Sequence, residues 1–295
     1  MSLWTLIRII AGLMVMAAVV FTILLVRHVR EEPMEGFFAE LVPVTVDSQP
    51  MVALPQAGSD MPDIDPGMKV FEKAREMIAI GDLAGARDRL RTVVSIYPRS
   101  KAAPEARRIV GEMNLDEVLS TANLENKSVY TVVRGDSYLG ITAKHRTSLD
   151  MLMYLNALMD LNSLQPGDEL MVMPLEFRLL IEPKREALSV WDGGVFVKEF
   201  PLKAVVGAPG GDQKTTIAGK SAVREGRRYG PATPGYRGAS KVITIERMPL
   251  VIAAIPENAD PEELARGFYL DPADMEELAL LTRTGNEVEI RSSAR

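Results

Sequence analysis

The side chains that most often carry covalent or metal chemistry are nearly absent from this chain. It holds no cysteine and two histidines, His28 and His145. Without cysteine there is no thiolate nucleophile, no thiolate metal ligand, no disulfide and no lipid-modified cysteine. Two histidines do not make a histidine-based metal site, so we expect neither a metal nor a cofactor.

A hydroxyl activated by a lysine is the covalent chemistry that remains, because a Ser–Lys pair can act as nucleophile and base. The spacing of these residues marks no such pair, and we interpret them as ordinary loop residues. The hydroxyls considered are Thr215, Thr216, Ser221 and Ser240, with Lys214 or Lys220 as base.

An arginine cluster is a second candidate. Arg224, Arg227 and Arg228 lie beside Tyr229, and guanidinium groups bind carboxylates. The alternative interpretation is a solvated basic loop.

Two turns between residues 130 and 174 could expose backbone groups to a ligand. Gly135-Asp136-Ser137 follows one expected strand, and Pro166-Gly167 precedes another. Turns present backbone N–H and C=O groups, and Tyr138 or Leu164 could supply a small apolar contact beside them. The same turn residues could also serve only to shape the chain.

The elements that hold these turns are expected in the order strand, helix, helix, strand. A strand covers 130–133, and Asp136 or Ser137 caps a helix that contains Leu139. A second helix starts near Thr147, and a last strand covers 169–173. We expect Asn156 to support the core and His145 to lie in a solvated loop.

This segment, 130–174, resembles the LysM family over the whole length of that module. The matching positions are Tyr130, Val132, Gly135, Asp136, Ser137, Leu139, Ile141, Leu155, Asn156, Leu164, Pro166, Gly167, Leu170, Val172 and Pro174. The resemblance implies a shallow groove for N-acetylglucosamine-containing glycan, here peptidoglycan. The implied glycan-binding residues are Gly135, Asp136, Ser137, Tyr138, Leu139, Asn162, Ser163, Leu164, Gln165, Pro166 and Gly167.

Residues 177–293 are expected to form a mostly-β domain. Asp192-Gly193-Gly194 predicts a hairpin turn, and Asp271-Pro272 predicts the start of a helix that ends near Thr282. The expected strands are 177–181, 187–191, 195–202, 242–246, 250–255 and 287–291.

The two ends of this domain, 177–207 and 267–291, resemble an L,D-transpeptidase domain of the YkuD type, whereas 208–241 matches it poorly. That family uses a cysteine nucleophile, a histidine and an arginine. Here the cysteine position falls on or next to Gly267, the arginine position falls on Tyr269, and no histidine follows His145. The resemblance therefore implies a degenerate domain that lacks the catalytic groups.

Residues 67–120 show apolar residues at helical spacing. Gly81-Asp82 separates two helices, Tyr97-Pro98 ends the second, and a third covers 103–119. The register of Ala74, Ala86, Leu90 and Pro98 resembles a single tetratricopeptide repeat. One repeat is short, so the segment is either a spacer or a surface for another envelope protein or a second copy.

Residues 9–26 contain no charged residue, are apolar on all sides and are about long enough to cross a bilayer, which predicts an uncleaved transmembrane anchor over 3–26. Arg8 lies near the start of this anchor, but Arg27 and Arg30 follow it, and this charge distribution alone favours the opposite orientation. We nevertheless expect the N-terminus inside the cell and the rest of the chain outside, because the later modules resemble extracytoplasmic domains. A proline-rich linker is expected over 31–66.

The sequence thus predicts a multidomain chain of 295 residues with a net charge of −6, which gives no support for nucleic-acid binding. Its fold class is a transmembrane helix, a small all-α hairpin, a βααβ LysM module and a mostly-β C-terminal domain. We expect a single-pass inner-membrane protein that tethers or positions wall machinery without catalysis. The alternatives are a wall enzyme of L,D-transpeptidase type with a non-cysteine nucleophile, or a regulator of a separate wall enzyme.

Overall fold

The computed structural model describes residues 12–22, 64–257 and 264–292, and the chain divides into two units, Met1–Asp63 and Ile64–Arg295. In the first unit residues 12–22 are helical. The rest of the expected anchor at 3–26 lies outside the described residues, as does the expected linker at 31–66 up to residue 63. Within the described ranges no helix is both long and apolar enough to span a membrane.

The second unit begins with three helices, α3 (Pro66–Ala79), α4 (Leu83–Ile96) and α5 (Ala103–Leu119). Asp65 and Asp82 cap the first two, each accepting a hydrogen bond from a backbone N–H three residues on. Gly81 separates these helices at a φ of +83°. The three predicted helices are therefore confirmed, and we call 66–119 the helical segment.

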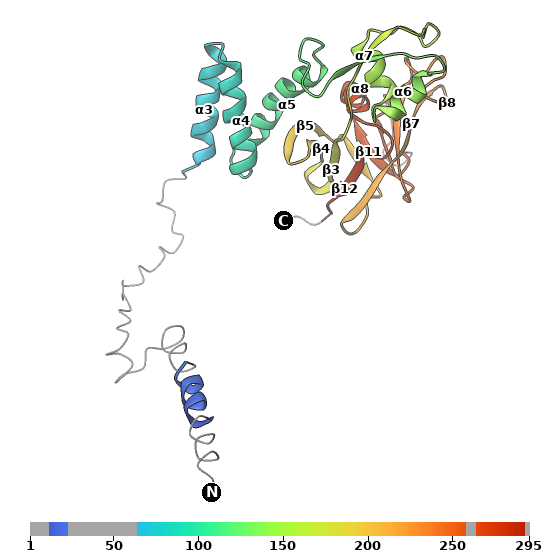
Figure 1. Ribbon diagram of the computed structural model, residues 1–295. Coiled ribbons are helices and arrows are strands. Elements are labelled where there is room, and N and C mark those ends of the chain that lie inside the picture. Colours follow the sequence, from blue (N-terminus) through green and yellow to red (C-terminus); the bar gives the residue numbers. More distant parts are fainter. Residues whose placement is uncertain (1–11, 23–63, 258–263, 293–295) are drawn as a thin grey trace. The chain divides into compact units, whose positions relative to one another are not determined.

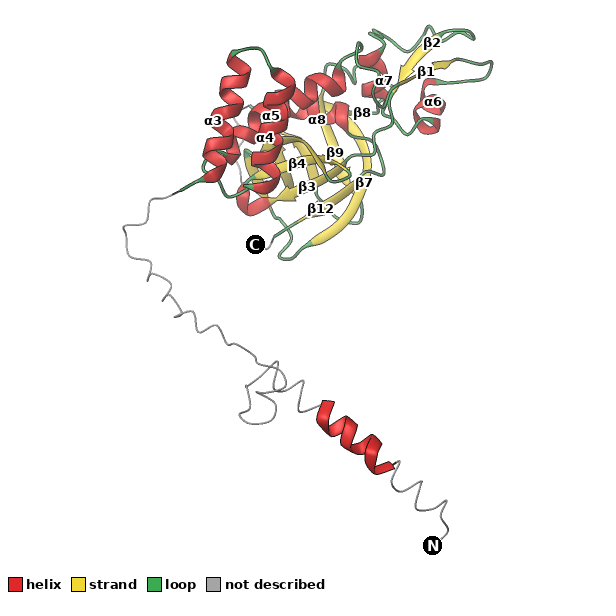
Figure 2. Ribbon diagram, turned by 60° about the vertical axis from the view of Figure 1, so that its left-hand side comes forward, coloured by secondary structure: helices red, strands yellow, loops and turns green. Residues whose placement is uncertain are grey.

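The helical segment packs against the sheet of the C-terminal domain rather than standing apart as a spacer. Helix α5 lies on strand β5 (Val195–Pro201). The Asn114 amide donates to the carbonyls of Phe196 and Val197, at 3.0 Å each. Phe196 also joins the apolar core of the helices. The helices thereby cover the edge strand of the sheet (Figure 2).

Residues 128–174, which we call the module, contain β1 (Ser128–Thr131), α6 (Tyr138–Lys144), α7 (Leu149–Leu155) and β2 (Glu169–Val172). The predicted order of elements is observed, and β1 pairs antiparallel with β2. Ser137 and Ser148 cap the two helices. The module has its own small core, which includes Val132, Ile141 and Leu170.

Residues 177–292, the β domain, form a curved ten-stranded sheet around one core, with helix α8 (Pro272–Leu281) packed against strands β9 and β10. The strand order is β5-β4-β3-β12-β7-β9-β10-β11-β6, with β8 beside β7. Its first half contains β3 (Arg178–Glu182), β4 (Ala187–Asp192), β5 and β12 (Glu287–Ile290). Its second half contains β6 (Ala204–Val206), β8 (Arg227–Tyr229), β9 (Ser240–Ile245), β10 (Val251–Ala254) and β11 (Gly267–Leu270).

Strand β7 (Gln213–Arg224) joins the two halves, because it pairs with β12 near its start and with β9 further along. The six predicted strands are present with small shifts in their ends, but the sequence analysis missed β6, β7, β8 and β11. Most residues of β7 are polar or only partly buried, so the strand lacks a continuous apolar pattern.

The module is held to the β domain by a shared core and a buried ion pair. Met151 and Leu155 of α7 belong to the same apolar core as the sheet. The Asp150 carboxylate pairs with Lys220 of β7, and their side chains are 10% and 6% exposed. Tyr236 donates a hydrogen bond to Asp150 at 3.1 Å. Figures 1 and 2 show the helical segment at one end of the β domain and the module at the other.

The buried pair predicts a large stability effect. Replacing Lys220→Met leaves the Asp150 carboxylate buried with Tyr236 as its remaining side-chain partner, which should lower the free energy of unfolding by about 3 kcal/mol. Lys203 is the matched control, because its ion pair with Asp271 is half exposed, at 47% and 50%. Lys203→Met should cost less than about 1 kcal/mol. Equal effects in chemical denaturation would contradict the structural role of the buried pair.

Candidate functional site

The structure brings the two predicted glycan-binding loops, 135–139 and 162–167, to one edge of the module. Val132, just after β1, donates its N–H to the Asp168 carbonyl and accepts a bond from the Gly167 N–H, both at 2.8 Å. These two bonds extend the β1–β2 ladder into the loops. The loops are therefore neighbours in space although residues 140–161 lie between them in the sequence. We call them the glycan loops.

Most of the predicted residues in the glycan loops are accessible. Asp136 and Leu164 are half-buried, and Tyr138 is buried in the module core at 8% exposure. Tyr138 therefore does not supply the apolar contact for which the sequence analysis considered it. Leu139 is 55% exposed and is the large apolar side chain that the first loop presents to solvent. The exposed members are Gly135, Ser137, Leu139, Asn162, Ser163, Gln165, Pro166 and Gly167.

Four of these residues shape the loops through local interactions. Gly135 and Gly167 have φ values of +97° and +98°, which side chains other than glycine rarely adopt. Asp136 accepts hydrogen bonds from the Val133 N–H and the Tyr130 hydroxyl, and both lower the pKa of its carboxyl. Ser137 accepts the cap bond from Gly140. Their residue types are thus explained by backbone geometry, while the loop surface stays open to a ligand.

Asn156 supports the core as predicted, since its amide bonds both the N–H and the carbonyl of Met171 on β2. His145 differs from the prediction of a solvated loop residue. It follows α6, its ring lies 4.7 Å from that of Tyr130, and its Nε2 is buried without a partner among the described residues. Burial, followed by the charge of Lys144, lowers the pKa of His145, which favours the neutral ring.

The position expected to carry a nucleophile is closed by the backbone. Gly267 lies on β11 and pairs in parallel with Val251 of β10. A Cβ atom at Gly267 would lie 2.3 Å from the Val251 carbonyl oxygen, far inside van der Waals contact. Tyr269, at the expected arginine position, is buried and donates its hydroxyl to the Ala265 carbonyl. The residue types at both positions are therefore explained by the packing of the strands.

A cavity of about 650 Å³, which we call the apolar cleft, lies against the same strands. Val242, Val251, Ala253 and Tyr269 contribute to a mostly apolar lining. Arg228 lines this cleft. Arg227 and its cross-strand partner Arg224 of β7 face the other side, because neighbouring residues of a strand face opposite sides. Arg224 instead lies 5.7 Å from the Tyr229 ring. The predicted arginine cluster is therefore divided between two faces.

The hydroxyls and lysines considered as a catalytic pair are not brought together. Lys220 is held by Asp150 and by the carbonyls of Ala279 and Thr282, and its neighbour Ser221 lies on the opposite face of β7. Thr215 and Thr216 bond to Glu246. Lys241, which sequence analysis did not consider, is buried and donates to the carbonyls of Tyr236 and Ala239.

No protein-family model matches the chain, and no curated protein matches it by sequence. Among solved structures, an L,D-transpeptidase from Enterococcus faecium is similar at a TM-score of 0.28 and 11% identity, covering 39% of this chain and 49% of that one. An L,D-transpeptidase from Mycobacterium smegmatis gives 0.29 and 10%, covering 43% and 64%.

A fused zinc-dependent amidase/peptidase/peptidoglycan-binding protein from Clostridium acetobutylicum gives 0.29 and 10%, covering 39% and 51%. The chain thus spans between 49% and 64% of these three structures. TM-scores of this size do not assign a fold, so function has to be inferred from the residues of the chain itself.

Closure at Gly267 is testable by adding one methyl group. Gly267→Ala should lower the free energy of unfolding by about 2 kcal/mol or more, because the new atom collides with the Val251 carbonyl. Gly194 is the matched control, since a Cβ there meets no atom within 4 Å. Gly194→Ala should leave stability unchanged within about 0.5 kcal/mol. If both variants are as stable as the parent chain in urea, the position is not closed.

Proposed function

We propose that the chain is a membrane-anchored, non-catalytic envelope protein that binds peptidoglycan through the glycan loops and tethers or positions wall machinery. The observation that carries this proposal is the adjacency of the two loops, which the hydrogen bonds of Val132 to Gly167 and Asp168 hold together, with Leu139 exposed in the first of them.

The chemistry of the glycan loops suits an uncharged N-acetylated sugar. Asn162 and Gln165 carry exposed amides that can both donate and accept hydrogen bonds. Leu139 offers an exposed apolar side chain that an acetyl methyl group can contact. Asp136, the one charged residue in the two loops, already accepts two hydrogen bonds. The surface is therefore polar without strong charge.

A single shallow site binds weakly, and attachment to a membrane would compensate for this. An anchored module meets its ligand at high effective concentration, so modest affinity suffices for retention. The apolar segment at 3–26 would serve as the anchor and the proline-rich 31–66 as a spacer, with the module and the β domain on the outer side of the inner membrane.

The β domain would act in this proposal as a rigid support and not as a catalyst. The absence of cysteine removes the thiolate on which the resembled enzymes depend. The Lys220 ammonium, the buried base candidate, is committed to Asp150 and to two carbonyls. The helical segment, packed on β5, would extend the same support, and its outer helices remain a surface for another envelope protein.

The proposal predicts that the full chain sediments with insoluble peptidoglycan. Leu139→Ser should weaken retention roughly fivefold, because about 1 kcal/mol of apolar contact is lost. Leu124 is the matched control, since it is 62% exposed and lies before the module. Leu124→Ser should bind as the parent chain does. Sedimentation no greater than that of an unrelated acidic protein would refute the proposed function.

A further inference from the structure

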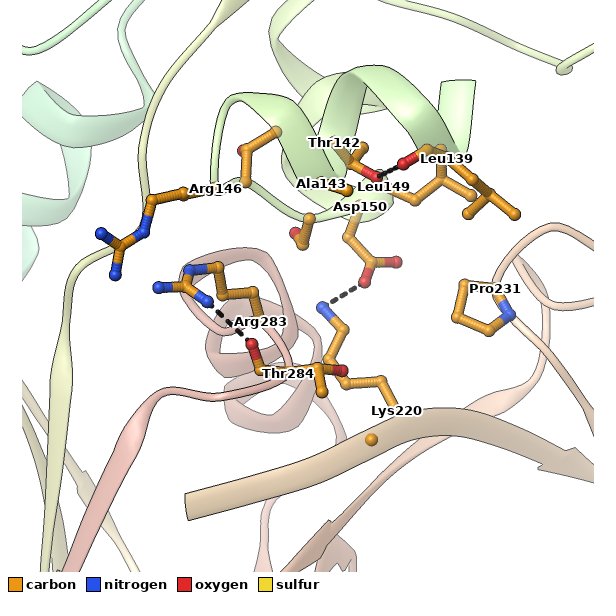
Figure 3. A pocket seen from close by; sticks show the side chains of 13 residues that line it. Leu139, Thr142, Ala143, Arg146, Leu149, Asp150, Lys220, Pro231, Arg283 and Thr284 are labelled. Atoms are coloured by element: carbon orange, nitrogen blue, oxygen red, sulfur yellow. Dashed lines mark hydrogen bonds and ion pairs between the residues drawn. The ribbon is translucent and has the colours of Figure 1, made fainter. Parts of the chain in front are cut away.

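A second cavity, of about 450 Å³, lies where the module meets the β domain. We call it the interdomain cavity. The module contributes residues from Leu139 to Asp150, and the β domain contributes Lys220, Pro231, Arg283 and Thr284. Figure 3 shows Leu139 and Pro231 on one side of this space and the guanidinium groups of Arg146 and Arg283 on the other. Its volume lies within the range of small-ligand sites, roughly 300–1,000 Å³.

The arginine side of the interdomain cavity carries one positive charge more than its carboxylates neutralise. Arg146 and Arg283 share a single partner, Glu176, at 2.7 and 3.4 Å. Arg283 is further held by the carbonyls of Leu175 and Thr284. Arg146 meets Glu176 through Nε, and neither of its terminal nitrogens has an acceptor in the described part of the chain. These two nitrogens, at the solvent-exposed margin of the cavity, can donate to a further carboxylate.

The floor of the cavity is polar but already neutral. The Lys220 ammonium faces the Asp150 carboxylate, as the dashed line in Figure 3 marks, and Tyr236 donates to the same carboxylate. Because each of these groups has its partners, the floor adds no free charge. In the wall of the cavity the Thr147 side chain is 6% exposed, and its hydroxyl has no partner among the described residues. The free charge thus lies at one end.

The opposite end of the cavity continues into the glycan loops. Leu139 is both the last residue of the first glycan loop and part of the cavity lining. A ligand bound to the loops would therefore enter the cavity at Leu139. It would pass the Lys220–Asp150 ion pair before it reaches Arg146. Such a ligand must combine a sugar with a branch of a few residues that ends in a carboxylate. In peptidoglycan, short acidic peptides branch from the glycan strand in this way.

We propose that the interdomain cavity binds the carboxylate-bearing peptide of the same polymer whose glycan strand lies on the glycan loops, an inference that rests on the proposed function. The module would then recognise the sugar, and the β domain would recognise what is attached to it. This explains why the module is fixed to the β domain and does not hang on a linker.

The test uses the full chain and two soluble peptidoglycan fragments, one with its peptides intact and one with the peptides cleaved off. Isothermal titration calorimetry should give roughly tenfold tighter binding of the peptide-bearing fragment, the effect expected of one charge-assisted contact. Arg146→Gln should abolish this preference and leave the affinity for the bare glycan unchanged. Converting the peptide carboxylates to amides should have the same effect on the parent chain.

The matched control is Arg75→Gln. The side chains of Arg75 and Arg146 are 61% and 63% exposed, and each forms an ion pair with one glutamate. It should keep the full preference. Equal affinity of the parent chain for both fragments, or a preference that survives in Arg146→Gln and with amidated peptides, would overturn the cavity inference and leave glycan binding intact. Binding of neither fragment would instead refute the proposed function, and the cavity inference with it.

Discussion

The architecture of the compact unit depends on one buried ion pair, between Lys220 of the long strand β7 and Asp150 of the module helix α7. Burial lowers the pKa of Lys220, and the facing carboxylate opposes that shift by favouring the charged form. A buried charge that loses its partner is costly, so the module cannot turn away from the sheet without a large loss of stability. The glycan loops and the interdomain cavity are held in one orientation by this constraint.

The parts of the fold that follow local rules were predictable from sequence. Asp82, Ser137 and Ser148 each cap a helix, and apolar spacing marks α3 to α7. Strand β7 was missed because its order comes from pairing with β12, β8 and β9, which the local sequence does not encode. The resemblance to LysM modules indicated both glycan loops. The accessibility of Tyr138 was not predictable because spacing does not show which side of a seven-residue helix faces the core. His145 lies in the loop between α6 and α7 as predicted, but its contact with the Tyr130 ring comes from tertiary packing.

The interdomain cavity had no signal in the sequence, since Arg146 and Arg283 meet only through tertiary packing. The closure at Gly267 has the same origin. Two parallel strands, β10 and β11, approach so closely that the Val251 carbonyl occupies the space of a side chain. The β domain therefore has a cleft of about 650 Å³ beside a position that does not accept even a methyl group. Such a domain is suited to holding and orienting a ligand, and the apolar cleft and the interdomain cavity are separate spaces within it.

The central claim is that ligand binding begins at the glycan loops of the module. Hydrogen–deuterium exchange of the full chain, with and without an N-acetylglucosamine oligomer, tests it most directly. The account predicts slower exchange in 135–139 and 162–167, with the strands around the apolar cleft, 240–254 and 264–270, unchanged. Protection of the cleft strands while the glycan loops exchange as before would contradict it.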